Sequence, residues 1–327
     1  MSRIKDNDYL CVSAMLRARE AHMIPADVFA RMADAESVQA AAKMAEDYGY
    51  TGLDVTTPQT LDAGLAKVRA GVYRELAGIL PDASLLDLFR LKYDYHNAKA
   101  LVKNASRLPL QESVLSEEGR FSVEEIKALF ADETASGVLK DAMTEASQTL
   151  AKTENPQLAD FGLDLAYFKE MRQCARSLGG ASEGYIKLLI DVANLNSYVR
   201  SVRMGKSADF LKFALVEGGS LDADLLLARW PDQDVSDLYA GGPLESAAKF
   251  AGEAMGGWKI TPFELACDNA LTEYLAKTRY VPFGADAVVS YLASLDTELM
   301  DLRMVLSGKI CGIPGEAIKE RLRDVNV

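Results

Sequence analysis

The sequence predicts an all-α protein built from three degenerate copies of one helical unit. Ala and Leu are the two most frequent of the residue types in this 327-residue chain, whereas β-branched runs are short, and this composition favours helices. No segment shows the polar–apolar alternation of a half-buried strand. One motif also recurs three times, with its anchor residues 97 and 107 positions apart. This spacing indicates an internal repeat of roughly one hundred residues.

The recurrent motif lies in three helical segments, 88–104, 188–206 and 290–308. In each segment an acidic residue is followed three positions later by an amide or a second acid, and the two share one helix face. Two positions further on there is a cation in two of the three copies, placed to reach a neighbouring helix. We expect the polar sets to form a hydrogen-bonded structural network that fixes the register between copies. The sets are Asp94, Asn97 and Lys99; Asp191, Asn194 and Asn196; and Glu298, Asp301 and Arg303.

Two further elements support the repeat. An acidic residue precedes each anchor by 32, 27 or 30 positions and is expected near the start of a helix, where the helix dipole favours negative charge: Asp62, Asp164 and Asp268. Helix starts are also expected after the anchors, at Ser122, Ser220 and Pro314. Ser122 and Glu125 have the spacing of a capping box.

The helices can be assigned in chain order from apolar spacing and from Pro and Gly breaks. Two or three short helices are expected within 8–48, then a long helix over 58–78. The others are expected at 84–103, 122–150 (split near 136–137), 158–177, 182–204, 208–215, 221–228, 244–254, 262–279, 285–307 and 315–324. Polar, turn-rich segments at 109–119 and 231–243 interrupt this series. The expected units are therefore 1–132, 133–235 and 236–327.

The sequence offers no recognisable reaction centre. It has no Gly-rich phosphate-binding loop, and the Glu-x-x-His pairs of a di-metal carboxylate bundle are missing from the anchors. Its two histidines, His22 and His96, lack a second ligand at metal-binding spacing. The four cysteines are widely scattered and form no CxxC pair. We therefore expect no catalytic, metal or cofactor-binding residues.

Charge and hydropathy limit the partners. The formal net charge of −12 argues against a nucleic-acid backbone, which is bound by clustered Lys and Arg. It is compatible with docking onto a basic protein surface. No run of 18 residues is free of charge, so we expect no transmembrane helix.

The motifs resemble those of a known family. The anchor DYHNAKALVKN, its counterpart DVANLNSYVR and the C-terminal stretch from YVPFG (residues 280–284) to IKERL (318–322) are similar to the C subunits of bacterial and archaeal V/A-type rotary ATPases, whose vacuolar equivalent is the d subunit. The similarity covers essentially the whole chain. Ala98 departs from the leucine that the family usually places after the first anchor asparagine, which affects packing only.

The resemblance implies three helical wedges around a pseudo-three-fold axis, forming a funnel. It further implies a non-catalytic central-stalk rotor subunit without a cofactor, monomeric when isolated. Such a subunit receives the central coiled-coil shaft, sits on the proteolipid ring at the cytoplasmic face of the membrane, and transmits torque. The coupled ion, proton or sodium, is not encoded in this subunit. Two alternatives stay open: a helical adaptor unrelated to ion transport, and a carboxylate-rich enzyme with a metal between copies.

Overall fold

The computed structural model describes residues 4–104, 114–178 and 180–324. These residues form α-helices, 3₁₀ helices and connecting segments, and no strand occurs among them. The predicted all-α fold is confirmed. The chain divides into two compact units, one comprising Met1–Ala83 with Tyr239–Val327 and the other Ser84–Leu238. The finer division into three wedges stays a prediction.

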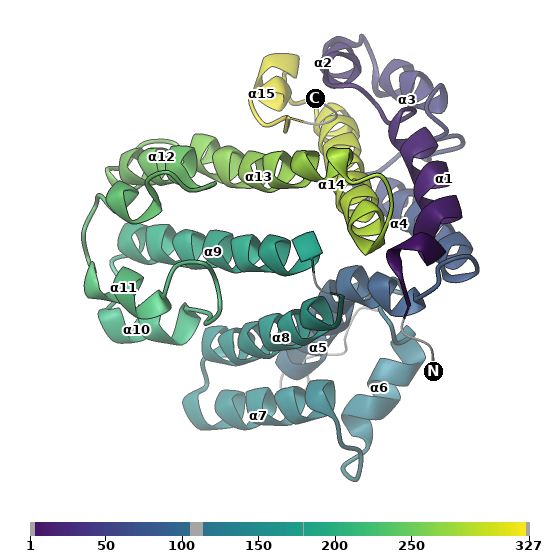
Figure 1. Ribbon diagram of the computed structural model, residues 1–327. Helices are drawn as coiled ribbons and strands as arrows, with labels where there is room; N and C mark the ends of the chain where they lie inside the picture. The colour runs from purple at the N-terminus through teal and green to yellow at the C-terminus, as the bar shows by residue number, and fades with distance from the viewer. Residues whose placement is uncertain (1–3, 105–113, 179, 325–327) are drawn as a thin grey trace. The chain divides into compact units, whose positions relative to one another are not determined.

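In the first unit, N-terminal and C-terminal helices surround one long helix, α14 (Ala285–Ile310). Helix α14 packs against α1 (Leu10–Glu20), α2 (Ala26–Asp34), α3 (Val38–Glu46) and α4 (Pro58–Ala77). Apolar side chains on most of its circumference are buried, including Val288, Leu292, Leu295, Leu302 and Val305. A helix that is apolar on nearly every side belongs in a core, and Figure 1 shows α14 among the purple N-terminal helices.

The remaining helices of the first unit come from the C-terminal part of the chain. They are α12 (Glu245–Met255), α13 (Thr261–Ala276) and α15 (Gly315–Lys319). Helices α12 and α13 pack together through buried alanines of α12, whose small side chains permit close approach. Arg17 of α1 donates to the carbonyls of Thr278 and Val281, 2.9 and 3.1 Å away. Both ends of the chain are thereby joined in one unit.

The second unit is organised around three helices that lie side by side (Figure 1): α5 (Asp87–Asn104), α7 (Val138–Thr153) and α8 (Pro156–Leu178). Helix α9 (Gly180–Arg203) packs on α8. Shorter helices complete the unit: α6 (Val123–Ala131), α10 (Ala208–Ala214) and α11 (Ala223–Ala228). The core contains fully buried Leu91, Met143, Leu163, Ile190 and Tyr198.

Most predicted helices are present with ends shifted by a few residues. The split near 136–137 is confirmed, and Ser122 caps α6 through the predicted reciprocal bonds with Glu125, at 3.2 and 2.8 Å. Pro314 precedes α15, as predicted. Part of the predicted 109–119 loop lies outside the described residues.

Three expectations about helix ends are wrong. The last helix ends at Lys319 instead of 324, because the chain then turns so that Arg323 reaches Asp268 and the buried Asp301. The helix expected over 262–279 ends at Ala276 and continues as a 3₁₀ turn to Tyr280. Ser220 does not start a helix: its N–H donates to Asp191, and Asp222 caps α11 two residues later.

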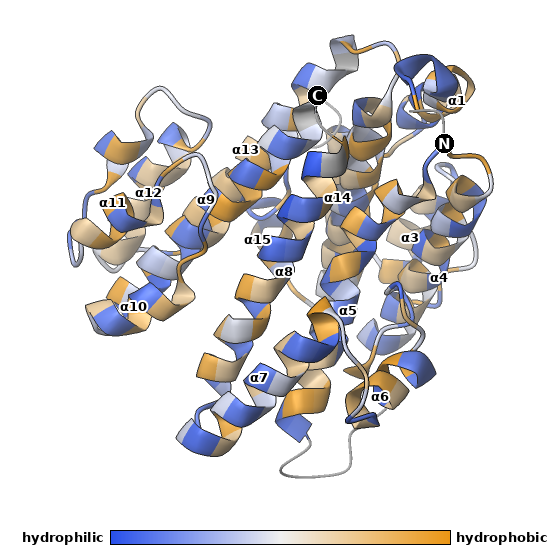
Figure 2. Ribbon diagram, turned by 60° about the horizontal axis from the view of Figure 1, so that its bottom comes forward, coloured by the Kyte–Doolittle hydropathy of each residue, from blue (hydrophilic) through white to orange (hydrophobic). Residues whose placement is uncertain are grey.

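Within the described residues, no helix is both long enough and apolar enough to span a bilayer. Figure 2 shows why: hydrophilic residues are interspersed among hydrophobic ones along the long helices.

Candidate functional site

The first polar set fastens a loop onto α5. Asp94, which is fully buried, accepts bonds from the backbone N–H groups of Arg120 and Phe121, at 2.9 and 3.3 Å. Its second oxygen accepts from Nε of Arg120 at 2.6 Å. A Cβ at Gly119 would lie 2.2 Å from the carboxylate, so only glycine lets the loop come this close. Burial raises the pKa of Asp94, and Arg120 opposes that shift by stabilising the carboxylate.

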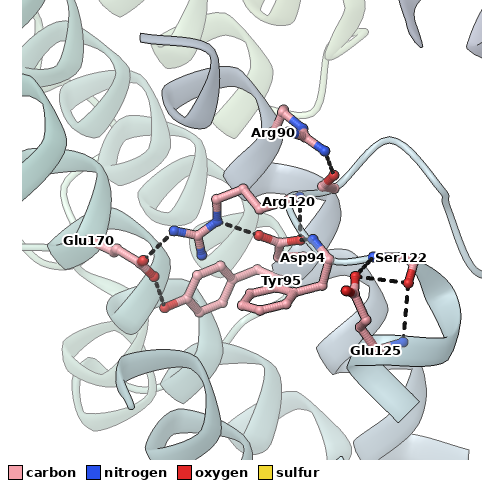
Figure 3. Close-up of polar contacts among 9 residues, drawn as sticks. Arg90, Asp94, Tyr95, Arg120, Ser122, Glu125 and Glu170 are labelled. Atoms are coloured by element: carbon pink, nitrogen blue, oxygen red, sulfur yellow. Dashed lines mark hydrogen bonds and ion pairs between the residues drawn. The ribbon is translucent and has the colours of Figure 1, made fainter. Parts of the chain in front are cut away.

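The same arginine extends this set to α8 (Figure 3). Nη1 of Arg120 lies 2.6 Å from a carboxylate oxygen of Glu170, and the hydroxyl of Tyr95 donates to the other oxygen at 2.9 Å. Burial alone would lower the pKa of Arg120, but its bonds to Glu170 and Asp94 raise it above its ordinary value. The guanidinium therefore stays charged and ties loop, α5 and α8 together within this unit.

The side-chain amide of Asn97 forms hydrogen bonds with both the N–H and the carbonyl of one loop residue, Ser116. Nδ2 donates to the carbonyl of Ser116 and Oδ1 accepts from its N–H, both at 2.8 Å. Asn97 is fully buried. This two-point contact fixes the position and the direction of the loop backbone without using its side chain.

The second copy repeats this geometry on α9. Asp191 accepts from the N–H groups of Ser220 and Leu221 at 2.9 and 3.1 Å. Asn194 holds both peptide groups of Val216, at 2.8 and 2.7 Å. A Cβ at Gly219 would lie 2.1 Å from Asp191. The glycine, the carboxylate and the amide thus recur in the same order.

The loop lengths show that these contacts are equivalent. Asn97 and Asn194 reach 19 and 22 residues ahead to their loop partners. Asp94 reaches 26 and 27 residues ahead, and Asp191 reaches 29 and 30. Every contact of the second copy is thus three residues longer. We call each such arrangement a helix–loop clamp: an Asp and an Asn on one helix face, binding the backbone of the following loop.

The third polar set keeps part of this pattern. Asp301 of α14, fully buried, accepts from the N–H of Arg323, 22 residues ahead, at 3.2 Å and from Nη1 of the same residue at 2.7 Å. Glu298 instead turns to the N-terminal region and accepts from the N–H of Ile24 and the hydroxyl of Tyr50. Burial raises the pKa of Glu298 to about 7, and that of Asp301 to about 6 despite Arg323.

The third residue of each set behaves differently in each copy. Lys99 forms an ion pair with Asp164 of α8, and Arg303 forms one with Asp62 of α4. Asn196 donates to the carbonyl of Val192 in its own helix, at 3.0 Å. The expected reach to a neighbouring helix is therefore confirmed for the two cations.

The three early acids, Asp62, Asp164 and Asp268, serve as ion-pair partners, and the expectation that each lies at a helix start is wrong for two of them. Asp164 and Asp268 lie two turns inside α8 and α13, where the dipole effect has faded. Asp268 instead pairs with Arg323 at 2.8 Å. Sequence reasoning identified these acids but missed Arg120, Glu170 and Arg323. Their partners lie in other elements, and no local spacing indicates them.

In both clamps the carboxylate accepts from two consecutive N–H groups of the following loop. Among residues 4–104, 114–178 and 180–324, no group of three potential metal ligands converges. A ring nitrogen of His96 lies 2.9 Å from the carbonyl of Val114, and one of His22 lies 3.0 Å from that of Ala18. Both imidazoles contact peptide carbonyls.

Comparison with known proteins gives one consistent result. The ATP synthase (C/AC39) subunit family matches residues 12–321. The C subunit of the V-type sodium ATPase of Enterococcus hirae is 22% identical over 343 aligned residues, covering 97% of this chain and 99% of its own. The C subunit of the A-type ATP synthase of Methanocaldococcus jannaschii is 23% identical, covering 96% and 86%. The protein of the same name from Thermococcus kodakarensis is 26% identical, covering 98% and 92%.

Proposed function

Because this chain belongs to the ATP synthase (C/AC39) subunit family, we propose that it is the central-stalk socket of a V/A-type rotary ATPase. In this role it joins a coiled-coil shaft to the proteolipid ring at the cytoplasmic face of the membrane and transmits torque. It is an accessory subunit without catalytic residues of its own. The full-length family match is the observation that carries the proposal.

The helix–loop clamps are consistent with a role in transmitting torque. A linker that transmits torque has to resist deformation in its loops as well as in its helices. Asp94 and Asp191 each bind two consecutive loop N–H groups, and Asn97 and Asn194 each hold both peptide groups of one residue. These four side chains are buried, and breaking a hydrogen bond to a buried polar group is costly. The loops after α5 and α9 are therefore stiffened by the helices that precede them.

The buried acids also support a non-catalytic role. A general acid or base needs access to a substrate proton. Asp94, Asp191, Glu298 and Asp301 are at most 5% exposed and are bound to peptide N–H, tyrosine or arginine groups. Their raised pKa values follow from burial, which structural carboxylates share with catalytic ones.

The proposal is tested by affinity purification of the tagged chain from detergent-solubilised native membranes, with mass spectrometry of the retained proteins. We expect the shaft subunits and the proteolipid ring to be recovered together. Recovery of soluble partners alone, with the ring intact but unbound, would overturn the socket role and favour the helical adaptor.

A further inference from the structure

A groove between α14 and α15 lies within the first unit and has a volume of about 490 Å³. Its walls are mainly apolar, with Met300, Met304, Ile313 and Ile318 among them. Met300 and Ile313 are 44% and 46% exposed. Ile318 seats α15 over Gly308, where a Cβ would lie 2.8 Å from its Cδ1. The groove is thus a formed feature with exposed apolar side chains, of the kind that marks an interaction site.

The charges at this groove are opposite to those of the whole chain. The protein has 48 acidic and 36 basic residues, yet the described residues that line the groove include three arginines and no acid. Arg303 is paired with Asp62, and Arg323 with Asp301 and Asp268. Arg321 forms no ion pair with the described residues. The groove therefore offers one uncompensated cation to an anionic partner.

A second polar group that lines the groove, the hydroxyl of Ser307, is also without a partner in the described part of the chain. The hydroxyl oxygen of Ser307 is buried but has no hydrogen-bond partner among residues 4–104, 114–178 and 180–324. Leaving a buried hydroxyl unpaired is costly. Because this oxygen has almost no accessible surface, the exposed groups that a partner would contact are Arg321 and the apolar side chains.

The shape of the groove favours a helix as the occupant. Met300, Met304, Ser307 and Cys311 recur at positions i, i+4, i+7 and i+11 of α14 and its C-cap, and all line the groove. This one-sided stripe extends for about 16 Å, which is three turns of a facing helix. Methionine side chains adapt readily to such a partner. We propose that the groove binds an amphipathic helix of another subunit, with an Asp or Glu facing Arg321.

The inference rests on the proposed function, because it requires a neighbouring subunit. Cys311 supplies the probe, since it is exposed and lines the groove. The thiol would be labelled with benzophenone maleimide in the intact membrane complex, with Cys11 and Cys174 replaced by serine. After illumination, mass spectrometry identifies the cross-linked segment. The matched control keeps Cys11, which is exposed on α1, and replaces Cys311 and Cys174.

We expect Cys311 to cross-link to an amphipathic helix that carries an acidic residue, and the Cys11 control to give no such product. Arg321→Glu should lower the yield roughly tenfold. In the Arg321→Glu variant, replacing the acidic residue of the captured helix by Lys should restore the cross-linking yield. Cross-linking to lipid, an absence of intermolecular product in an assembled complex, or no effect of Arg321→Glu would overturn the inference. Absence of the chain from the complex would instead overturn the proposed function.

Discussion

Replacing Asp191 by Ala tests whether the helix–loop clamp stabilises the second unit. The carboxylate accepts two backbone bonds, from Ser220 and Leu221, and is 5% exposed. Each bond to a charged acceptor contributes about 1.5–3 kcal/mol, and an unpaired donor adds a desolvation cost. Removing the buried charge recovers part of that loss, because burial disfavours the carboxylate. We expect the free energy of unfolding to fall by about 3 kcal/mol.

Urea unfolding followed by circular dichroism measures this change. Native-state hydrogen exchange at the amides of Ser220 and Leu221 reports whether the loop itself is released. Asp191→Asn keeps one good acceptor and should lose roughly half as much. Glu145→Ala, at an exposed position of α7 in the same unit, is the matched control and should change stability by less than about 0.5 kcal/mol. An Asp191→Ala midpoint equal to that of the wild type, with unchanged amide protection, would refute the reasoning.

Three other predictions concern a glycine of the second clamp, the buried Glu298 and the ion pair of Lys99. Gly219→Ala should destabilise the second unit by about 2 kcal/mol in thermal melting, since its Cβ would collide with Asp191. The control is Gly162→Ala, at a helical glycine with open space around it, which should stabilise the same unit by about 1 kcal/mol. The pKa of Glu298 is raised from 4.5 to about 7, so the folded state holds its proton more tightly and stability should fall by about 3 kcal/mol as pH rises from 4.5 to 7. Denaturation at several pH values should show that Glu298→Gln removes this slope, and an unchanged slope would contradict the assignment. Lys99→Ala should cost less than about 1 kcal/mol in urea unfolding, because its ion pair is partly exposed.

The repeated polar positions could be predicted because they break an apolar helical pattern at a fixed spacing. Asp94 and Asp191 stand out in this way, and both are buried. Their binding partners could not be predicted, since the donors are peptide N–H groups that every loop residue possesses. In the sequence, the loop side of these contacts is marked only by Gly119 and Gly219, which lie next to the donors and have no side chain to collide with the carboxylate.

The partners of the charged groups depend on tertiary packing. Arg120 lies in a loop and bonds to Asp94 and Glu170, which are 26 and 50 residues away. No local period connects these residues. The early end of α15 has the same cause, because the contacts of Arg323 with Asp301 and Asp268 outweigh the helix propensity of the residues after Lys319.

The two-point contact of Asn97 and Asn194 has a consequence for the sequence that each loop can tolerate. Each amide binds the N–H and the carbonyl of one loop residue, which is Ser116 in one case and Val216 in the other. Since these groups are common to nearly all amino acids, mutations at the bound position leave the contact intact. Segments that share this contact can therefore differ in sequence at the bound loop position and still keep the same arrangement of helix and loop.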